Sequence, residues 1–184
     1  MDNFLTVLVT FFVGVGSLGL YTYISVVLER VQVDTIPGMW IWGIGGAVGA
    51  FGIGRVLDKV DSSRKLTTII IVLLAADFAM LLLFPSSRMV ALVCLFAWGL
   101  LGWSSMAPQQ HSMLSANPDE GATAVAANAS ANYLGSAVGS AVGGLFLPSS
   151  TGILLGALFV VLLGIVCSIG ARALSFPKPR DNEN

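Results

Sequence analysis

Long runs of apolar residues dominate the chain, and short polar or proline-containing segments separate them. A helix needs about 20 apolar residues to cross roughly 30 Å of hydrocarbon. Six runs come close to or exceed this length and predict six spans, at residues 4–28, 37–54, 67–85, 89–107, 121–147 and 151–174. Strands are not expected, because an open sheet edge leaves backbone groups unsatisfied in lipid. The pattern predicts an all-α integral membrane bundle over residues 1–176 and a polar cytoplasmic tail at 177–184.

The composition makes a lipid bilayer the expected surroundings. Hydrophobic residues make up 55% of the 184 residues and charged residues only 10%, whereas a soluble domain carries about 25% charged residues. The net charge of −1 gives no reason to expect a nucleic-acid partner. With one histidine and two isolated cysteines, Cys94 and Cys167, the chain implies no metal site and no cofactor. No catalytic Ser/His/Asp set or phosphate-binding loop is present, so no catalytic residues and no enzyme are expected.

The basic residues indicate which ends of the predicted spans face the cytoplasm. Six spans place both termini on one side, together with the loop between the second and third spans. That side holds seven of the nine Lys and Arg residues, and the other holds only Arg30 and Arg88. Since cytoplasmic loops carry the excess of basic residues, we expect both termini to be cytoplasmic in a multi-pass protein of a bacterial-type inner or plasma membrane.

Two glycine-rich segments half a chain length apart match each other. Residues 45–49 read Gly-Gly-Ala-Val-Gly and residues 135–139 read Gly-Ser-Ala-Val-Gly. Inverted repeats of three spans plus three occur within the halves of some secondary transporters, although chance also produces such matches in a chain rich in Gly and Ala. Small residues let helices approach closely, which predicts helix packing at Gly45, Gly49, Gly135, Gly139 and Gly143.

Polar residues at intervals of four share one helix face in two of the predicted spans. The fifth span carries such a stripe at Asn128, Asn132, Ser136 and Ser140. The first span carries another at Ser17, Tyr21 and Ser25. The amides either join helices through modest hydrogen bonds or line a cavity. The tyrosine either binds an amphipathic solute through its ring and hydroxyl or sits in the interfacial aromatic belt.

Asp77 is the only acidic residue deep inside a predicted span. A carboxylate at mid-bilayer costs about 2.5–3.5 kcal/mol on insertion scales, and burial favours the neutral form. Asp77 is therefore a proton-coupling candidate, with a protonated carboxyl bonded to a neighbouring helix as the structural alternative. In the fourth span Trp98, Trp103 and Met106 suit a soft cavity wall or simple packing. His111 is expected in the loop that follows.

The loop at residues 54–65 carries a dense group of charges between two spans. Its residues Gly54, Asp58, Lys59 and Arg64 resemble the cytoplasmic loop motif of the major facilitator superfamily, Gly-x-x-x-Asp-Arg/Lys-x-Gly-Arg-Arg/Lys. That motif joins the second and third spans of each six-span half. Asp61 and Ser62 depart from its strong form, which has Gly and a basic residue there. The resemblance implies a gating loop; a loop that only sets orientation is the alternative.

The similarity to that superfamily extends over most of the chain. Residues 21–25 and 126–144 look like the seventh and eleventh spans of its drug:proton antiporters and sugar-efflux members. The resemblance implies the C-terminal six-span half of a major facilitator fold, built as a 3+3 inverted repeat. It favours a substrate-lining role for Ser17, Tyr21, Asn128, Asn132 and Ser136. The third span, which holds Asp77, lies outside the lining set of that fold.

The predicted function is membrane transport by a half-size or partial efflux transporter for a small, partly apolar solute, with proton coupling as a candidate driving force. Alternating access comes from one bundle rocking against another, so the chain needs a second six-span half. This partner is either a second copy in a homodimer or a separate N-terminal half. The alternatives are a non-transporting assembly partner, a truncated remnant, or another six-span fold with a coincidental loop.

Overall fold

Every regular element of the protein between residues 2 and 173, the residues that the computed structural model describes, is helical. In order, the elements are α1 (Asp2–Val13), the π-helical segment η1 (Gly14–Leu18), α2 (Gly19–Tyr21), α3 (Ile24–Arg30), α4 (Thr35–Leu57), α5 (Ser63–Leu83), α6 (Arg88–Ser104), α7 (Met106–Ala116), α8 (Gly121–Gly143), the 3-10 turn η2 (Gly144–Phe146) and α9 (Ser150–Ala173). The predicted tail at residues 177–184 lies outside the described residues.

Five helical segments are long and apolar enough to cross a membrane: Phe4–Tyr21, Thr35–Leu57, Ser63–Leu83, Arg88–Ala116 and Ser150–Ala173. They confirm the prediction of an all-α membrane fold. The sixth predicted span is also a helix, α8, and its 23 residues are long enough to cross. It is less apolar than the other five, because alanine, glycine, serine and asparagine fill most of its positions. Among the described residues, α8 is thus the long helix least suited to full contact with lipid.

The first predicted span is interrupted, so a single helix over residues 4–28 was a wrong prediction. At η1 the backbone widens, and the Gly19 N–H donates to the Gly14 carbonyl five residues earlier. The helix then breaks at Thr22 and Tyr23, where Tyr23 has φ −108° and ψ 21°, before α3 begins. A hydropathy pattern reports burial in an apolar medium and carries no information on such a change of helical turn. π-Bulges of this kind are frequent at functional sites.

The fourth predicted span extends beyond its apolar run. α6 and α7 carry the chain helically from residue 88 to residue 116 with one interruption, at Ser105. Pro108 accounts for the interruption, since it has no N–H to donate to the Ser104 carbonyl four residues earlier. We predicted a loop from Pro108 onward, and this was wrong. Gln109 ends the apolar run, yet its side chain is buried and hydrogen-bonded inside the bundle.

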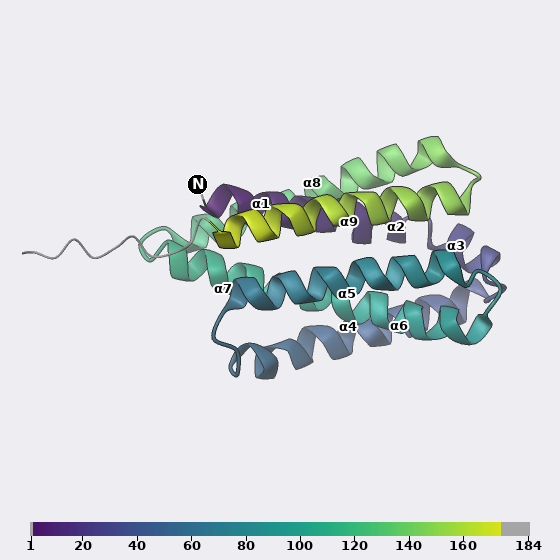
Figure 1. Cartoon of the computed structure of the whole chain (residues 1–184), viewed down its shortest axis with the longest axis horizontal. Coiled ribbons are helices and arrows are strands. Elements are labelled where there is room, and N and C mark those ends of the chain that lie inside the picture. Colours follow the sequence, from purple (N-terminus) through teal and green to yellow (C-terminus); the bar gives the residue numbers. More distant parts are fainter. Residues whose placement is uncertain (1, 174–184) are drawn as a thin grey trace, which may run out of the picture.

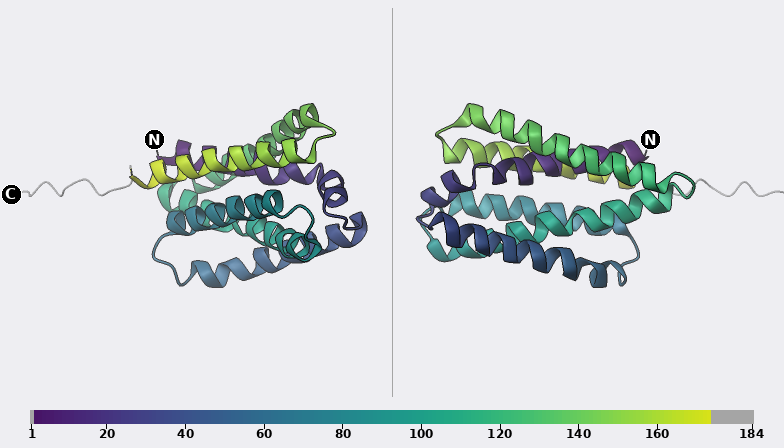
Figure 2. Two further views of the ribbon diagram at one scale, coloured as in Figure 1. Left: turned by 45° about the vertical axis from the view of Figure 1, so that its right-hand side comes forward. Right: turned by 180° about the vertical axis from the view of Figure 1, so that it is seen from behind.

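The helices lie in two layers. α9 and α5 are in front in Figure 1, whereas α8, α1, α7 and α4 come to the front when the bundle is seen from behind (Figure 2, right). The most extensive contacts pair α4 with α6, α8 with α1 and η1, α1 with α9, α5 with α6, and α5 with α9. If the first span is exchanged with the fourth, the second with the fifth and the third with the sixth, each of these helix pairs becomes a pair of the same set. A 3+3 repeat has this property.

Glycines make the closest helix contacts at equivalent places in the two halves of the bundle. A Cβ on Gly45 of α4 would collide with the Phe96 carbonyl of α6. Likewise, a Cβ on Gly135 of α8 would collide with the Phe11 carbonyl of α1. The same close approach recurs one turn further along each helix, at Gly49 and Gly139. Backbones in direct contact gain van der Waals attraction, which replaces the hydrophobic drive that is absent in lipid.

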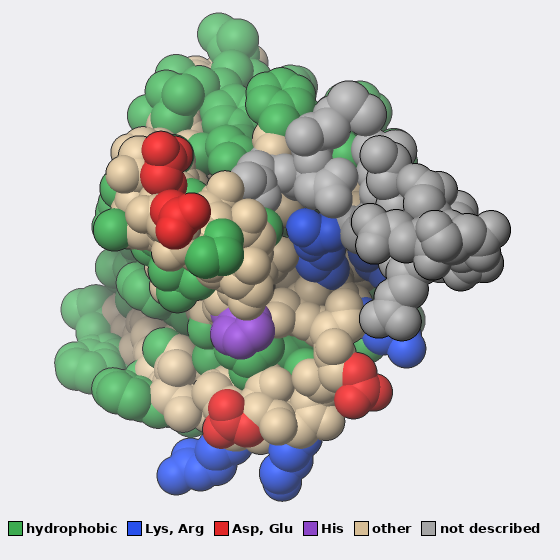
Figure 3. Space-filling model, turned by 90° about the vertical axis from the view of Figure 1, so that its left-hand side faces the viewer, with side chains coloured by type: hydrophobic (Ala, Val, Ile, Leu, Met, Phe, Trp, Pro, Cys, Tyr) green, Lys and Arg blue, Asp and Glu red, His purple; other side chains and the backbone are tan. Residues whose placement is uncertain are grey.

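Charged side chains gather at one end of the bundle. This end, on the left in Figure 1, holds the starts of α1, α5 and α8 and the ends of α4, α7 and α9. Seen end-on, it exposes acidic and basic side chains on several sides of the histidine (Figure 3). Five of the seven Lys and Arg residues in the described part belong to it: Arg55, Lys59, Arg64, Lys65 and Arg172. The two ends differ in basic charge, as the two sides of a membrane protein do.

Replacing Gly45 by Ala is expected to destabilise the bundle, because a Cβ there has no room beside the Phe96 carbonyl. Overpacking of this kind costs about 1–3 kcal/mol, so thermal unfolding of the purified protein in detergent should begin at a lower temperature. Gly52→Ala on the same helix is the matched control, since a Cβ at Gly52 meets nothing within 4 Å. Equal unfolding midpoints for the two variants would contradict the close contact of α4 with α6.

Candidate functional site

We call the layer that contains α8, α1, α7 and α4 the rear layer. It surrounds a cavity of about 100 Å³, which we call the four-helix cavity. Its walls come from α1–η1, α4, α6–α7 and α8. They consist of Val13, Ser17, Leu18, Trp42, Gly102, Trp103, Met106, Asn132 and Tyr133. Apolar walls with a few polar groups are the usual composition of a small-molecule site. None of these lining residues carries a charge.

Aromatic packing fixes the wall that Trp42 contributes. The ring of Tyr21 stacks on Trp42, with ring centroids 4.1 Å apart and planes 29° apart. Trp98 and Trp103 meet the same indole edge-on, at centroid distances of 6.1 and 6.4 Å. Each aromatic pair contributes about 0.5–1.5 kcal/mol beyond its burial. The Trp42 ring is therefore held from several sides, although it belongs to a helix at the edge of the bundle.

A hydrogen bond ties Ser17 to the aromatic cluster. Trp98 Nε1 donates to Ser17 Oγ at 3.0 Å and so joins α6 to η1. Both side chains are buried, with exposed fractions of 0% for Trp98 and 2% for Ser17. Gly102 allows this approach, because a Cβ there would lie 2.8 Å from Ser17 Oγ. The widened turn of η1 thus presents a serine hydroxyl to the cavity between two packed helices.

A second polar cluster lies in the same bundle, one helical turn from the cavity. The Thr10 hydroxyl donates to Asn128 Oδ1 at 2.6 Å, and it also lies within hydrogen-bonding reach of Gln109 Oε1 and of the Thr6 carbonyl at 3.1 Å. The side chains of Thr10, Asn128 and Gln109 are each 2% exposed. The cluster joins α1, α7 and α8 at a depth where water is excluded, so it holds the three helices in one register.

The predicted lining residues separate into three groups in the structure. Ser17 and Asn132 line the four-helix cavity, and Tyr21 stands behind its wall against Trp42. Asn128 belongs to the buried cluster with Thr10. Ser136 is half-buried on α8 outside the lining. Sequence reasoning missed Trp42, whose place on the buried face of α4 is signalled by its spacing of three residues from Gly45.

Asp77 lies in a different place. It lines a groove of about 500 Å³ between α5 and α6, with Met80, Cys94 and Leu101 among its neighbours. The side chain is 7% exposed, and its Oδ2 has no hydrogen-bond partner among the described residues. This groove shares no lining residue with the four-helix cavity. The structure therefore separates the acidic side chain from the predicted substrate-lining residues.

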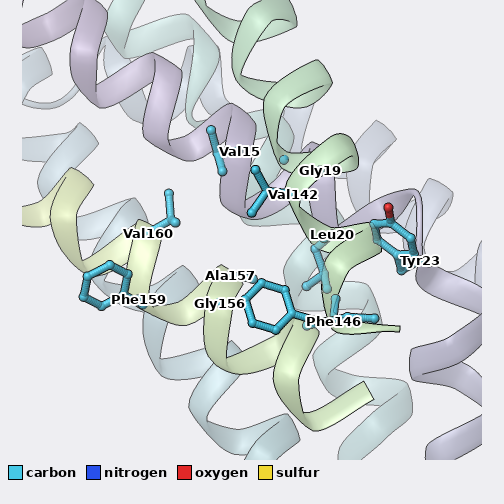
Figure 4. Close-up of a pocket in the computed structure, with 13 residues that line it drawn as sticks. Val15, Gly19, Leu20, Tyr23, Val142, Phe146, Gly156, Ala157, Phe159 and Val160 are labelled. Atoms are coloured by element: carbon cyan, nitrogen blue, oxygen red, sulfur yellow. The ribbon is translucent and has the colours of Figure 1, made fainter. Parts of the chain in front are cut away.

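A third hollow, of about 270 Å³, opens between α8 and α9. Figure 4 shows its apolar walls, with Val142 and Phe146 on one side and Phe159 and Val160 on the other. Its one polar side chain, Tyr23, already donates from its hydroxyl to the Ser140 carbonyl, and the Tyr23 ring abuts Gly143. With no polar group left to orient a solute, this groove is a weaker candidate than the four-helix cavity.

The residues of the loop motif lie at the charged end of the bundle. Gly54, Asp58 and Lys59 are exposed at the end of α4. Arg64, at the start of α5, donates from Nε to Ser112 Oγ of α7 at 3.2 Å. His111 of α7, predicted in a loop, is helical and lies with Nδ1 2.7 Å from Ser63 Oγ. The described residues contain no group of three or more His, Cys, Asp or Glu side chains placed to hold a metal ion.

Comparison with protein families gives a match. The model described as Major Facilitator Superfamily matches residues 1–140 of the chain. The matched range contains the loop motif and every residue that lines the four-helix cavity. Comparison with solved structures gives no match.

Thr10→Val should destabilise the protein, because it removes the hydroxyl hydrogen that Asn128 Oδ1 accepts at a buried site. An unsatisfied buried polar group costs about 1–3 kcal/mol, which thermal unfolding in detergent will detect. Thr123→Val, on the exposed face of α8, is the control and should leave the midpoint unchanged. If both variants unfold like the original protein, the cluster does not hold the helices together.

Proposed function

The chain belongs to the major facilitator superfamily, and we propose that it forms one half of an efflux transporter for a small, partly apolar solute. Its family and its apolar helices make it a multi-pass membrane protein of the transporter class. The four-helix cavity is the observation that carries the proposal, because it combines apolar walls with the few polar groups that orient a solute. The loop motif and the polar residues of α1 and α8 support the C-terminal half of a drug:proton antiporter or sugar-efflux relative.

The outward face of α8 supports a protein partner in place of lipid. Its exposed positions on the cavity side are small or amphipathic: Ala126, Ser130, Tyr133 and Ala137. The outward face of α9 carries large apolar side chains instead: Leu155, Phe159, Leu162, Val166 and Ile169. Lipid tails solvate the apolar outward face of α9 well. The outward face of α8 suits another helix, since small residues let backbones approach closely.

A corresponding stripe of small residues runs along α4. Its members, spaced by four, three and four, are exposed and share one face: Gly43, Ala47, Ala50 and Gly54. A Cβ on Gly43 or Gly54 would meet nothing within 4 Å in the single chain. α4 and α8 form the two edges of the rear layer (Figure 2, right). The four-helix cavity therefore lies between two surfaces that are ready for close helix contact.

These two stripes favour a second copy of the chain as the partner. The halves of this superfamily are related by an axis along the membrane normal. A two-fold axis of that kind can run along the exposed side of the rear layer, which faces away from α5 and α9. It then sets α4 of one copy against α8 of the other. The cavities of the two copies then face each other, and rocking of the copies would open them alternately to each side. A separate N-terminal half offers the same geometry and is the alternative partner.

The charged end of the bundle supports a cytoplasmic position for the loop motif. Among the described residues, five Lys and Arg residues lie at this end and two at the other end. This matches the excess of basic residues that cytoplasmic surfaces of membrane proteins carry. Asp58 and Lys59 are exposed and are free to meet a partner bundle. In this arrangement Gly54, Asp58, Lys59 and Arg64 act as the gating loop between α4 and α5.

Asp77 supports proton coupling through its buried, half-satisfied carboxyl group. A charged carboxylate is costly inside a bilayer, and Oδ2 has no partner in the described part of the chain. Its neighbour Phe78 packs edge-on against Trp98 at 5.7 Å, and Trp98 in turn holds Ser17. Movement of α5 on protonation would therefore reach the four-helix cavity through one aromatic contact and one hydrogen bond.

Ser17→Ala, Asn132→Ala and Tyr21→Ala are each expected to weaken export from cells that produce the protein. The serine and asparagine changes each remove a neutral hydrogen-bonding group worth about 0.5–1.5 kcal/mol, which corresponds to a loss of roughly 2- to 12-fold in apparent affinity. Tyr21→Ala instead removes the ring that stacks on Trp42 and supports the cavity wall. Resistance of the cells to a panel of toxic solutes measures the effect, and Thr151→Ala at the exposed start of α9 is the control. Unchanged export in all three variants would remove these residues from the solute path.

Asp77→Asn is expected to abolish accumulation driven by a proton gradient while leaving exchange down the solute gradient intact. The amide has the shape of the acid but does not take up and release a proton at neutral pH. Solute uptake into proteoliposomes, with and without a pH gradient, separates the two activities, and Asp77→Glu should retain some coupling. Full gradient-driven uptake by Asp77→Asn would exclude this residue as the coupling group.

A further inference from the structure

A small polar space lies between α1, α5, α7 and α9, close to the charged end of the bundle. We call it the inner chamber; its volume is about 10 Å³. Its lining consists of Thr6, Val9, Arg64, Thr67, Gln109, Ser112, Ser168 and Ala171. The uncharged polar side chains among them are buried, with exposed fractions of 9% or less. Hydrogen-bonding groups from four helices thus converge on one small space.

Most of the buried polar side chains of the bundle belong to this chamber or are linked to it. Of the thirteen buried polar or charged side chains in the described part of the chain, five line the chamber. Three more, Thr10, Thr68 and Asn128, are connected to these five by hydrogen bonds. Polar side chains within membrane spans usually face the bundle interior or a water-filled space. Their concentration here favours a hydrated space.

The hydrogen bonds at the chamber wall use hydroxyl hydrogens and leave oxygens able to accept. Each hydroxyl has one hydrogen and two lone pairs. Thr67 donates to the Ser63 carbonyl at 3.1 Å. Because Thr68 donates to the Arg64 carbonyl at 2.9 Å, Ser168 supplies the hydrogen of the 2.7 Å bond between the Thr68 and Ser168 hydroxyls. The oxygens of Thr67 and Ser168 therefore keep lone pairs for a further donor.

Two amide oxygens compete for the single hydrogen of the Thr10 hydroxyl. Asn128 Oδ1 accepts it at 2.6 Å, and Gln109 Oε1 contacts the same hydroxyl. Gln109 also lines the inner chamber, so a donor in the chamber would relieve this competition. Ser112 offers the complementary group. Its oxygen accepts from Arg64 Nε at 3.2 Å, which leaves its own hydrogen to donate.

Water fits both the size of the inner chamber and its pattern of donors and acceptors. A buried water molecule needs roughly 10–15 Å³ and makes about three hydrogen bonds. Ser112 can donate to it, and it can donate to Gln109 Oε1 and to a threonine or serine oxygen of the wall. The volume of about 10 Å³ excludes an organic solute, and the guanidinium of Arg64 repels a cation.

Arg64 and Ser112 separate the inner chamber from a wider pocket at the end of the bundle. This end pocket has a volume of about 350 Å³, and its lining consists of Ser62, Ser63, Arg64, His111, Ser112, Ser115 and Ala116. Arg64 and Ser112 line both spaces. His111, the one histidine of the chain, marks the place of the end pocket on the charged end in Figure 3. The hydrogen bond between Arg64 and Ser112 thus lies at the boundary of the two spaces.

From these observations we propose that the inner chamber binds a water molecule, which enters from the end pocket past the side chain of Arg64. Water then reaches Gln109, and the hydrogen-bonded cluster carries the polar path on to Asn128, one helical turn from the four-helix cavity. The site goes beyond the proposed transport function and requires no solute. It gives Arg64 of the loop motif a definite task, that of a side-chain barrier to water.

Proton-detected solid-state NMR of the protein in lipid bilayers tests this proposal, because magnetisation passes from water to protein protons close to it. Protein labelled with ¹⁵N in its glutamine side chains gives one NH₂ group each from Gln32, Gln109 and Gln110. Gln32→Glu and Gln110→Glu assign the signals. We expect transfer from water to Gln109, although this side chain is 2% exposed, as well as to the exposed Gln32. Transfer to Gln32 with none to Gln109 would overturn the proposal.

Filling the inner chamber should remove the transfer to Gln109 and leave that to Gln32. Ala171→Val adds two methyl groups to the chamber wall, and Ala173→Val, on the exposed side of the same helix, is the matched control. Thr67→Val keeps the shape of the side chain without its hydroxyl and should reduce the transfer. Undiminished transfer to Gln109 in both Ala171→Val and Thr67→Val would show that its protons receive magnetisation from elsewhere, and the chamber would be rejected as the water site.

Removing the barrier should speed the transfer to Gln109. Arg64→Ala is the test, and Arg55→Ala, at an exposed position near the end of α4, makes the same change of charge as a control. Equal transfer rates in these two variants would reject Arg64 as the barrier. Replacing chloride in the buffer by gluconate should change nothing, and a loss of the Gln109 response on its return would identify a bound anion in place of water. A dry chamber in a protein that exports solute would reject this site and leave transport intact.

Discussion

Direct contact between helix backbones at glycine is the interaction on which the rest of this structure depends. In lipid, helices gain little from burying apolar side chains against one another, and association relies on van der Waals packing. Gly45 sets α4 on α6 and Gly135 sets α8 on α1, each against a backbone carbonyl.

The same packing explains why the polar groups of the bundle are concentrated in its rear layer. Because α8 approaches α1 so closely, Asn128 reaches Thr10 and is satisfied inside the protein. Asn132, one turn further on, lines the four-helix cavity. A helix with this content of small and polar residues is poorly solvated by lipid. α8 is stable as a span only when α1 covers one side and another protein surface, in our proposal, covers the other.

Sequence reasoning located the helices well and the contacts between them only in part. Hydropathy places a span because burial in lipid imposes a length, and glycine spacing marked the close contacts at Gly45 and Gly135. It did not locate the π-turn of η1 or the helical continuation through Gln109, since both depend on partners distant in the chain. Trp42 was missed for the same reason, because its role depends on Tyr21 and Trp98, and a single indole in an apolar run carries no signal of its partners.

The central claim is that α4 of one copy packs against α8 of another in front of the four-helix cavity. Cysteine crosslinking in nanodiscs tests it most directly. Protein carrying Ala47→Cys is mixed with protein carrying Ala137→Cys, both lacking Cys94 and Cys167, and Ile169→Cys on the lipid-facing side of α9 serves as control. We predict rapid formation of a product linking residue 47 to residue 137 and none from residue 169. Equal crosslinking at residue 169, or a single chain per nanodisc with no product, would contradict the claim.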